Sequence, residues 1–164
     1  MKTKVLAAFS MVFFFISVMS ASGQSTIFSG EWKLNKEKST ALNDQLFLSK
    51  MTILQKNDSL FTNRVYENGY GEAYPFQENL SLSGAESKIT IYDMPRKAKA
   101  LMTENNKSIA FESITTFYGN GGADDLKTKE KWSIENGGKT LKMDYSTSYS
   151  GGTSEGTLYF DKVK

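Results

Sequence analysis

The sequence contains neither cysteine nor histidine among its 164 residues. Without cysteine there are no disulfides, no thiolate metal sites and no sulfur nucleophile. Without histidine the chain lacks the usual general base, the commonest metal ligand and the usual proximal haem ligand. These absences exclude Ser-His-Asp and Cys-His catalysis and typical zinc sites, and we expect no metal site and no cofactor. Carboxylates and tyrosines remain for acid–base chemistry.

Long apolar runs are also scarce, and the one present lies at the N-terminus. The basic segment Met1–Lys4 precedes an apolar run from Val5 to Met19, which small residues follow up to Gly23. This order is typical of a secretory signal peptide, with cleavage expected between Gly23 and Gln24. The alternative is a membrane anchor, but the run is shorter than the roughly 20 residues that a spanning helix needs.

We therefore expect a signal peptide over residues 1–23 and one domain over residues 24–164, periplasmic or secreted and not inserted in a membrane. No cysteine follows the apolar run, so the chain offers no site for a lipid anchor on cysteine. A cysteine-free exported domain fits a bacterial protein better than a small secreted eukaryotic one. Loss of residues 1–23 leaves 18 basic and 18 acidic residues, because only Lys2 and Lys4 are removed. Overall charge therefore gives no basis for binding nucleic acid.

Beyond the apolar run, polar and apolar residues alternate with period two in short segments separated by turns. The clearest segment is Thr140–Tyr149, and the Asn136-Gly137 pair before it is a strong hairpin signal. Such a pattern predicts an all-β domain. About ten strands are expected, at Phe28–Leu34, Lys50–Lys56, Leu60–Tyr66, Ala73–Leu82, Ser87–Tyr92, Lys97–Thr103, Ser108–Tyr118, Lys127–Glu135, Thr140–Tyr149 and Gly156–Asp161.

Short turns between these segments favour an up-and-down meander of antiparallel strands. A long meander removes its exposed edges by closing on itself, which favours a barrel over a sandwich. We expect a single barrel of 8 to 10 strands in which the last strand pairs with the first. The segment between Asn35 and Gln45 shows little apolar spacing and is expected to hold one short helical turn.

Three short stretches resemble the lipocalin-like, calycin-type barrels of bacterial secreted proteins. They are Gly30–Ser39, Glu130–Ile134 and Gly138–Met143. The resemblance implies that Gly30 and Trp32 form the glycine-x-tryptophan motif of the first strand, with Gly30 allowing close packing and Trp32 closing the floor. It also implies an interior that holds a small ligand.

The family pattern adds a late basic residue, commonly arginine, over this tryptophan. No arginine follows Arg96 here, so Lys162 is the candidate for that place. The paired arginine and tyrosine near the C-terminus of the related fatty-acid-binding barrels are also missing.

Five residues are candidates for contact with a ligand. Arg64 and Glu130 each fall within an alternating strand, and a charge that points into a barrel is costly unless it is paired. Such a residue marks an internal ion pair or a ligand anchor; the alternative is that both lie near the rim and reach water. The aromatic side chains Phe111, Tyr145 and Tyr149 are candidates to line a cavity.

Two charged segments are interpreted as solvated surface. The stretch Gly119–Leu126, with Asp124 and Asp125, partly matches one calcium-binding nonapeptide, but such repeats bind calcium only when stacked. A flexible hairpin loop is expected there instead. The second segment is locally basic and is expected to form a solvated face; it contains Arg96, Lys97, Lys99 and Lys107.

Three functions remain open at this point. The first is a non-catalytic carrier that binds a small, largely apolar molecule inside the barrel. The second is an interaction or inhibitor module of the cell envelope, which predicts a filled interior and an exposed apolar patch. The third is an enzyme that uses carboxylates or tyrosine, which requires two titratable groups facing one pocket.

Overall fold

The computed structural model describes residues 27–40, 45–103, 105–119 and 121–163. The predicted signal peptide and its cleavage site lie outside these residues. Within them, no helix is long and apolar enough to cross a membrane.

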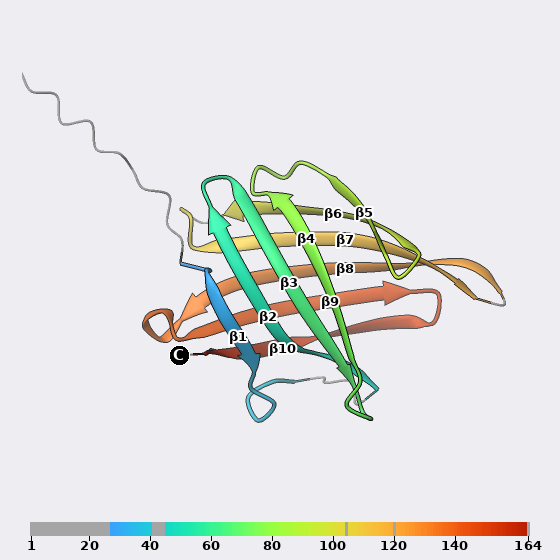
Figure 1. Cartoon of the computed structure of the whole chain (residues 1–164), viewed down its shortest axis with the longest axis horizontal. Helices are drawn as coiled ribbons and strands as arrows, with labels where there is room; N and C mark the ends of the chain where they lie inside the picture. Colours follow the sequence, from blue (N-terminus) through green and yellow to red (C-terminus); the bar gives the residue numbers. More distant parts are fainter. Residues whose placement is uncertain (1–26, 41–44, 104, 120, 164) are drawn as a thin grey trace, which may run out of the picture.

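Ten antiparallel strands and a three-residue 3-10 turn at Asn136–Gly138 make up the fold (Figure 1), which confirms the predicted all-β class. The strands are β1 (Gly30–Leu34), β2 (Leu46–Lys56), β3 (Ser59–Asn68), β4 (Ala73–Ser81), β5 (Ser87–Ile91), β6 (Met94–Thr103), β7 (Ser108–Gly119), β8 (Gly122–Glu135), β9 (Thr140–Tyr149) and β10 (Gly152–Lys162).

The strands form one sheet in the order β4-β3-β2-β1-β10-β9-β8-β7-β6-β5, which curls into a nearly closed barrel. Strand β10 pairs with both β9 and β1, so the last strand joins the first as predicted. The sheet is not paired between β4 and β5. At one end this gap is closed by the residues after β4, where Ser83 bridges Leu101 and the Met102 amide donates to the Leu82 carbonyl (3.0 Å).

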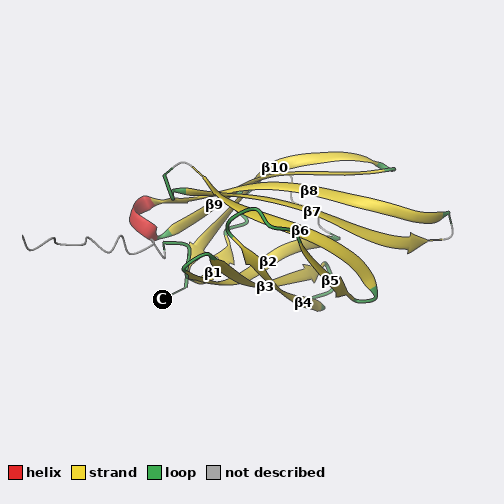
Figure 2. Cartoon of the chain, turned by 90° about the horizontal axis from the view of Figure 1, so that it is seen from above, coloured by secondary structure: helices red, strands yellow, loops and turns green. Residues whose placement is uncertain are grey.

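Figure 2 shows the barrel as two facing layers, with β1–β4 on one side and β7–β10 on the other. The β7–β8 hairpin reaches furthest beyond the barrel in both cartoon views. The hairpin predicted over Gly119–Leu126 is present, but its turn is shorter than predicted, because β8 already begins at Gly122. The carboxylates of this segment accept hydrogen bonds: Thr116 of β7 donates to Asp125 (2.7 Å), and the hydroxyl of Ser150, in the turn between β9 and β10, donates to Asp124. The hydrogen bond from Ser150 lowers the pKa of Asp124.

One turn follows β1 where a helical turn was expected. The Ser39 amide donates to the Asn35 carbonyl (3.2 Å), and the Asn35 side chain accepts from the Lys38 amide (3.1 Å). Residues 41–44 of the same connection lie outside the described residues.

Apolar side chains fill the end of the barrel where β1 begins and β10 ends. Trp32 is fully buried there, and its Nε1 donates to the Phe28 carbonyl (2.9 Å). Lys162 Nζ lies 5.0 Å from the centre of the Trp32 ring, so a lysine stacks on the indole as proposed from the sequence. The core at this end contains both tryptophans of the chain. Its members include Phe28, Trp32, Ile53, Leu60, Leu80, Ile109, Trp132, Leu141, Met143 and Phe160. This end is therefore a packed floor.

Gly30 lies against the Lys162 side chain. Its φ of +146° is unfavourable for other residues, and a Cβ atom at this position would lie 2.6 Å from Lys162 Cε. The glycine thus permits the close approach of β1 to the lysine that covers Trp32.

Removal of Thr157–Lys164 is expected to abolish cooperative folding. The deletion takes away most of β10, including the buried Leu158 and Phe160, and leaves β1 and β9 without their shared neighbour. Thermal unfolding followed by circular dichroism tests this. An insertion of two glycines between Gly151 and Gly152 is the control, because a longer turn keeps every strand pair. A sharp transition in the truncated protein would contradict the closed barrel.

Gly30→Ala is expected to lower the free energy of unfolding by about 1–3 kcal/mol, the usual cost of a strained backbone conformation. Urea denaturation measures the change. Gly152→Ala is the matched control, because its φ is +140° and a Cβ atom there has no neighbour within 4 Å. Equal losses in the two variants would show that the contact with Lys162 is unimportant.

Candidate functional site

The opposite end of the barrel contains a cavity of about 270 Å³. Its lining comes from β2 to β8 and from the turn between β5 and β6. Most of the lining is aromatic or aliphatic, from Leu46, Tyr66, Tyr74, Phe76, Ile91, Tyr92, Met94 and Leu126. The polar part consists of Arg96, Ser113, Thr115, Thr128 and Glu130. The interior is therefore packed at one end and hollow at the other.

Aromatic pairs form one wall of this cavity. The rings of Tyr66 and Phe76 stack at 6.0 Å, and those of Tyr74 and Tyr92 meet edge to face at 6.4 Å. The Tyr92 hydroxyl donates to the Pro75 carbonyl (2.6 Å), which ties the β5–β6 turn to β4 across the unpaired edge. The wall is thus held in place although β4 and β5 share no ladder.

An ion pair between Arg64 and Glu130 crosses the barrel beneath the cavity. Arg64 comes from β3 and Glu130 from β8, and the two form a bidentate pair with N–O distances of 2.8 and 3.0 Å. The Trp132 indole also donates to Glu130 (2.7 Å). Burial disfavours the charged form of Arg64, but Glu130 together with Tyr66 and Glu78 outweighs this effect and raises the pKa of the guanidinium. Arg64 is therefore held as a cation beside Glu130 inside the barrel.

A second ion pair joins Arg96 of β6 to Glu78 of β4. The Arg96 guanidinium donates to both carboxylate oxygens of Glu78, and its Nη1 also donates to the Thr115 hydroxyl (2.9 Å). Arg96 is 8% exposed and Glu78 3%. The pair connects strands on either side of the unpaired edge of the sheet.

Phe111 lies between the two ion pairs. The guanidinium carbon of Arg64 is 4.5 Å from the centre of its ring and that of Arg96 is 5.6 Å away. The ring also stacks on Trp132, at 5.9 Å. We call Arg64, Glu130, Arg96, Glu78 and Phe111 the ion-pair layer. It separates the packed floor from the cavity.

Some buried polar atoms at this level have no hydrogen-bond partner among the described residues. They include Ser113 Oγ, Thr62 Oγ1 and Arg64 Nε. Ser113 is 4% exposed and is one of the residues that line the cavity, but its hydroxyl oxygen is itself buried. Burial raises the pKa of the Tyr66 phenol, which therefore stays neutral at physiological pH.

The five residues predicted to bind a ligand lie at different depths. Glu130 lines the cavity, and Arg64 and Phe111 lie directly beneath it. Tyr145 packs against the core, whereas Tyr149 is 50% exposed and is not part of the lining. A contact between any of them and a ligand stays a prediction. The alternative that Arg64 and Glu130 reach water at the rim is wrong, because both are buried and paired with each other.

Arg96 was assigned to a solvated basic segment, and that interpretation is also wrong. Along β6 the inward residues Arg96, Ala98 and Ala100 alternate with the exposed Lys97 and Lys99. The period-two pattern of this strand already places Arg96 on the opposite face from Lys97 and Lys99. The aromatic wall was missed as well, because aromatic residues in an alternating strand look the same whether they fill a core or line a cavity.

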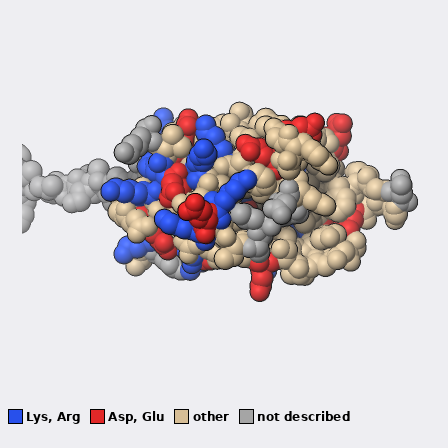
Figure 3. Space-filling view, turned by 90° about the horizontal axis from the view of Figure 1, so that it is seen from below, with Lys and Arg blue, Asp and Glu red and all other residues tan. Residues whose placement is uncertain are grey.

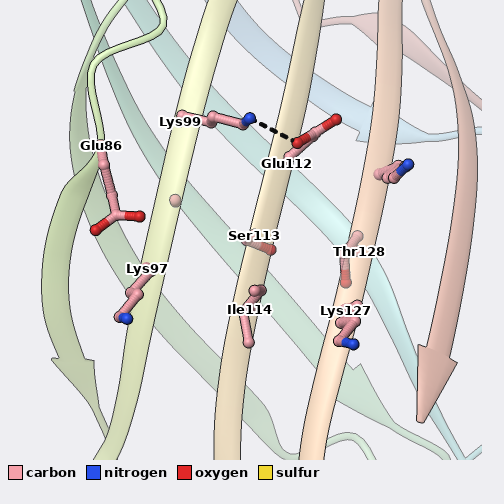
Figure 4. A pocket seen from close by; sticks show the side chains of 10 residues that line it. Glu86, Lys97, Lys99, Glu112, Ser113, Ile114, Lys127 and Thr128 are labelled. Atoms are coloured by element: carbon pink, nitrogen blue, oxygen red, sulfur yellow. Dashed lines mark ion pairs between the residues drawn. The ribbon is translucent and has the colours of Figure 1, made fainter.

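A second hollow, of about 240 Å³, lies on the outer face of β6, β7 and β8. Figure 4 shows Lys99 reaching toward Glu112, with Glu86, Lys97 and Lys127 around them. Lys99 Nζ lies 2.9 Å from a Glu112 carboxylate oxygen, and both side chains are about half exposed (53% and 46%). These are features of a solvated sheet face rather than of an enclosed site.

The rest of the surface carries mixed charge. Figure 3 shows acidic and basic side chains interspersed over one half of the face in view, while the other half is largely uncharged. In the described part of the chain, no group of three or more acidic side chains is placed to hold a metal ion.

Comparison with known proteins finds similarity in fold but not in sequence family. No family model and no curated protein matches the sequence. Among solved structures, zebrafish ileal bile-acid-binding protein, crystallised with cholic acid, is similar with a TM-score of 0.53 and 15% identity over 84% of this chain and 99% of its own.

A luciferase domain from the dinoflagellate Lingulodinium polyedrum is similar with a TM-score of 0.50 and 11% identity, over 85% of this chain and 42% of its own. At such identities the likeness concerns the fold. The chain thus shares with them the architecture of an antiparallel β-barrel.

Proposed function

We propose that this protein is an exported, non-catalytic carrier that binds a small, largely apolar molecule in the cavity above the ion-pair layer. The observation that carries the proposal is the incomplete filling of the barrel: apolar side chains pack one end, and about 270 Å³ remains at the other. A concave site with apolar walls and few polar groups is the usual form of a small-molecule site.

The volume of the cavity and the residues of its walls indicate which kind of ligand it can hold. Its volume lies just below the range of about 300–1,000 Å³ that is common for ligand pockets, so the bound molecule is small. The rings of Tyr66, Phe76 and Tyr92 favour an aromatic or alicyclic body. The zebrafish protein, whose structure contains cholic acid, supports the use of this fold to bind a small molecule with an alicyclic skeleton.

Export is supported by the N-terminal pattern of a basic segment, an apolar run and small residues over residues 1–23. On this proposal the carrier acts in the periplasm or outside the cell.

The other two functions have less support. An interaction module with a packed core predicts a filled interior, which the cavity opposes. An enzyme needs a free acid or base, but the oxygens of Glu130 and Glu78 are held by Arg64 and Arg96. The luciferase domain shows that a similar fold can be part of an enzyme, so the argument rests on these residues and not on the fold.

The proposal is tested by blocking the cavity from within. Thr128 of β8 faces the cavity, and Thr128→Phe is expected to weaken binding of the fluorescent apolar probe N-phenyl-1-naphthylamine at least about tenfold, equivalent to 1.4 kcal/mol. Fluorescence titration measures the affinity. Lys127→Phe is the matched control, because the neighbouring residue points to the outer face. If neither variant changes probe binding, or if the unmodified protein binds no probe, the proposed site is wrong.

A further inference from the structure

We propose that the cavity selects molecules that carry no net charge and discriminates against anions, although two arginines lie at its base. This inference rests on the proposed carrier function and names the class of ligand. It follows from the pairing of the buried charges and from a serine in the cavity lining whose hydroxyl has no partner among the described residues.

The charges at the base of the cavity cancel. Among the described residues that line it, Arg96 and Glu130 are the charged ones. Each has its own partner, Glu78 for Arg96 and Arg64 for Glu130. Two cations and two anions therefore form a neutral layer, and neither guanidinium faces the cavity without a carboxylate.

An anionic ligand would have to compete with these carboxylates. To bind Arg96, it would displace Glu78, which is 3% exposed and would remain buried without a partner. Breaking a buried ion pair in this way is strongly unfavourable. An anion that leaves the pairs intact loses its own hydration without gaining a cation. An uncharged molecule of the same shape meets neither cost.

Ser113 supplies a polar contact that suits an uncharged ligand. Ser113 is one of the residues between the cavity and the outer hollow, and its buried side-chain oxygen has no partner among the described residues, so a small shift of the hydroxyl would bring it to a ligand. A hydroxyl both donates and accepts a hydrogen bond. It therefore fits a carbonyl, a hydroxyl or an amine N–H of a ligand. The chemistry of the site thus points to a small apolar molecule with one uncharged polar group.

Two probes with a common ring skeleton test the selection. N-phenyl-1-naphthylamine is uncharged, and 8-anilino-1-naphthalenesulfonate adds one sulfonate to the same rings. Titration of the purified full chain is expected to give at least about tenfold tighter binding of the uncharged probe. Equal or tighter binding of the sulfonate overturns the inference alone. Failure of both probes to bind overturns the proposed function, and the inference with it.

Removal of one carboxylate is expected to weaken or abolish the preference. Glu78→Gln leaves the charge of Arg96 uncompensated, so the affinity ratio of sulfonate to uncharged probe should rise about tenfold or more. Glu130→Gln makes the same change at the other pair and serves if the first variant does not fold. Glu112→Gln is the control, because it removes an equal charge from the outer face. A folded Glu78→Gln or Glu130→Gln protein with an unchanged ratio contradicts the role of the ion pairs.

Ser113→Ala separates the polar contact from the charge effect. Loss of one hydrogen bond is expected to weaken binding of N-phenyl-1-naphthylamine by about two- to tenfold. The preference for the uncharged probe should remain, because both ion pairs are intact. Unchanged affinity would exclude Ser113 from the site.

Discussion

The structure depends on the pairing of two arginines with two glutamates inside a β-barrel. A buried guanidinium is tolerated only when a carboxylate neutralises it with good geometry, and here each one has such a partner. Arg64–Glu130 joins β3 to β8 across the interior, and Arg96–Glu78 joins β6 to β4. The pairs thus link strands that are not neighbours in the sheet. They also fix the level at which the apolar floor ends and the cavity begins.

The two ends of the barrel follow from this layer. Below it, both tryptophans are buried, and Lys162 covers Trp32 through its contact with the ring. Above it, aromatic walls enclose space that no side chain fills. Because the ion pairs are satisfied by the protein, they demand little from a ligand. An apolar molecule can occupy this space without opening either pair.

The sequence predicted the individual strands better than the contacts between side chains from distant strands. Period-two alternation in Thr140–Tyr149 and the neighbouring segments was sufficient for an antiparallel barrel, and short turns implied that β10 meets β1. Alternation also placed Arg64 and Glu130 within strands, but the two residues lie 66 positions apart. Their pairing depends on the diameter of the closed barrel, which strand patterns do not give.

For Arg96 the information was present in the alternation with Lys97, yet the run of basic residues obscured it. The volume of the cavity depends on how side chains from seven strands pack together, which no local pattern records.

A crystal structure with N-phenyl-1-naphthylamine bound tests the central claim most directly. The account predicts density for the probe between Tyr66, Tyr92 and Ser113, above an ion-pair layer in which Arg64–Glu130 and Arg96–Glu78 are intact. A probe on the outer face of the sheet, or one bound by an arginine that has left its glutamate, would contradict it.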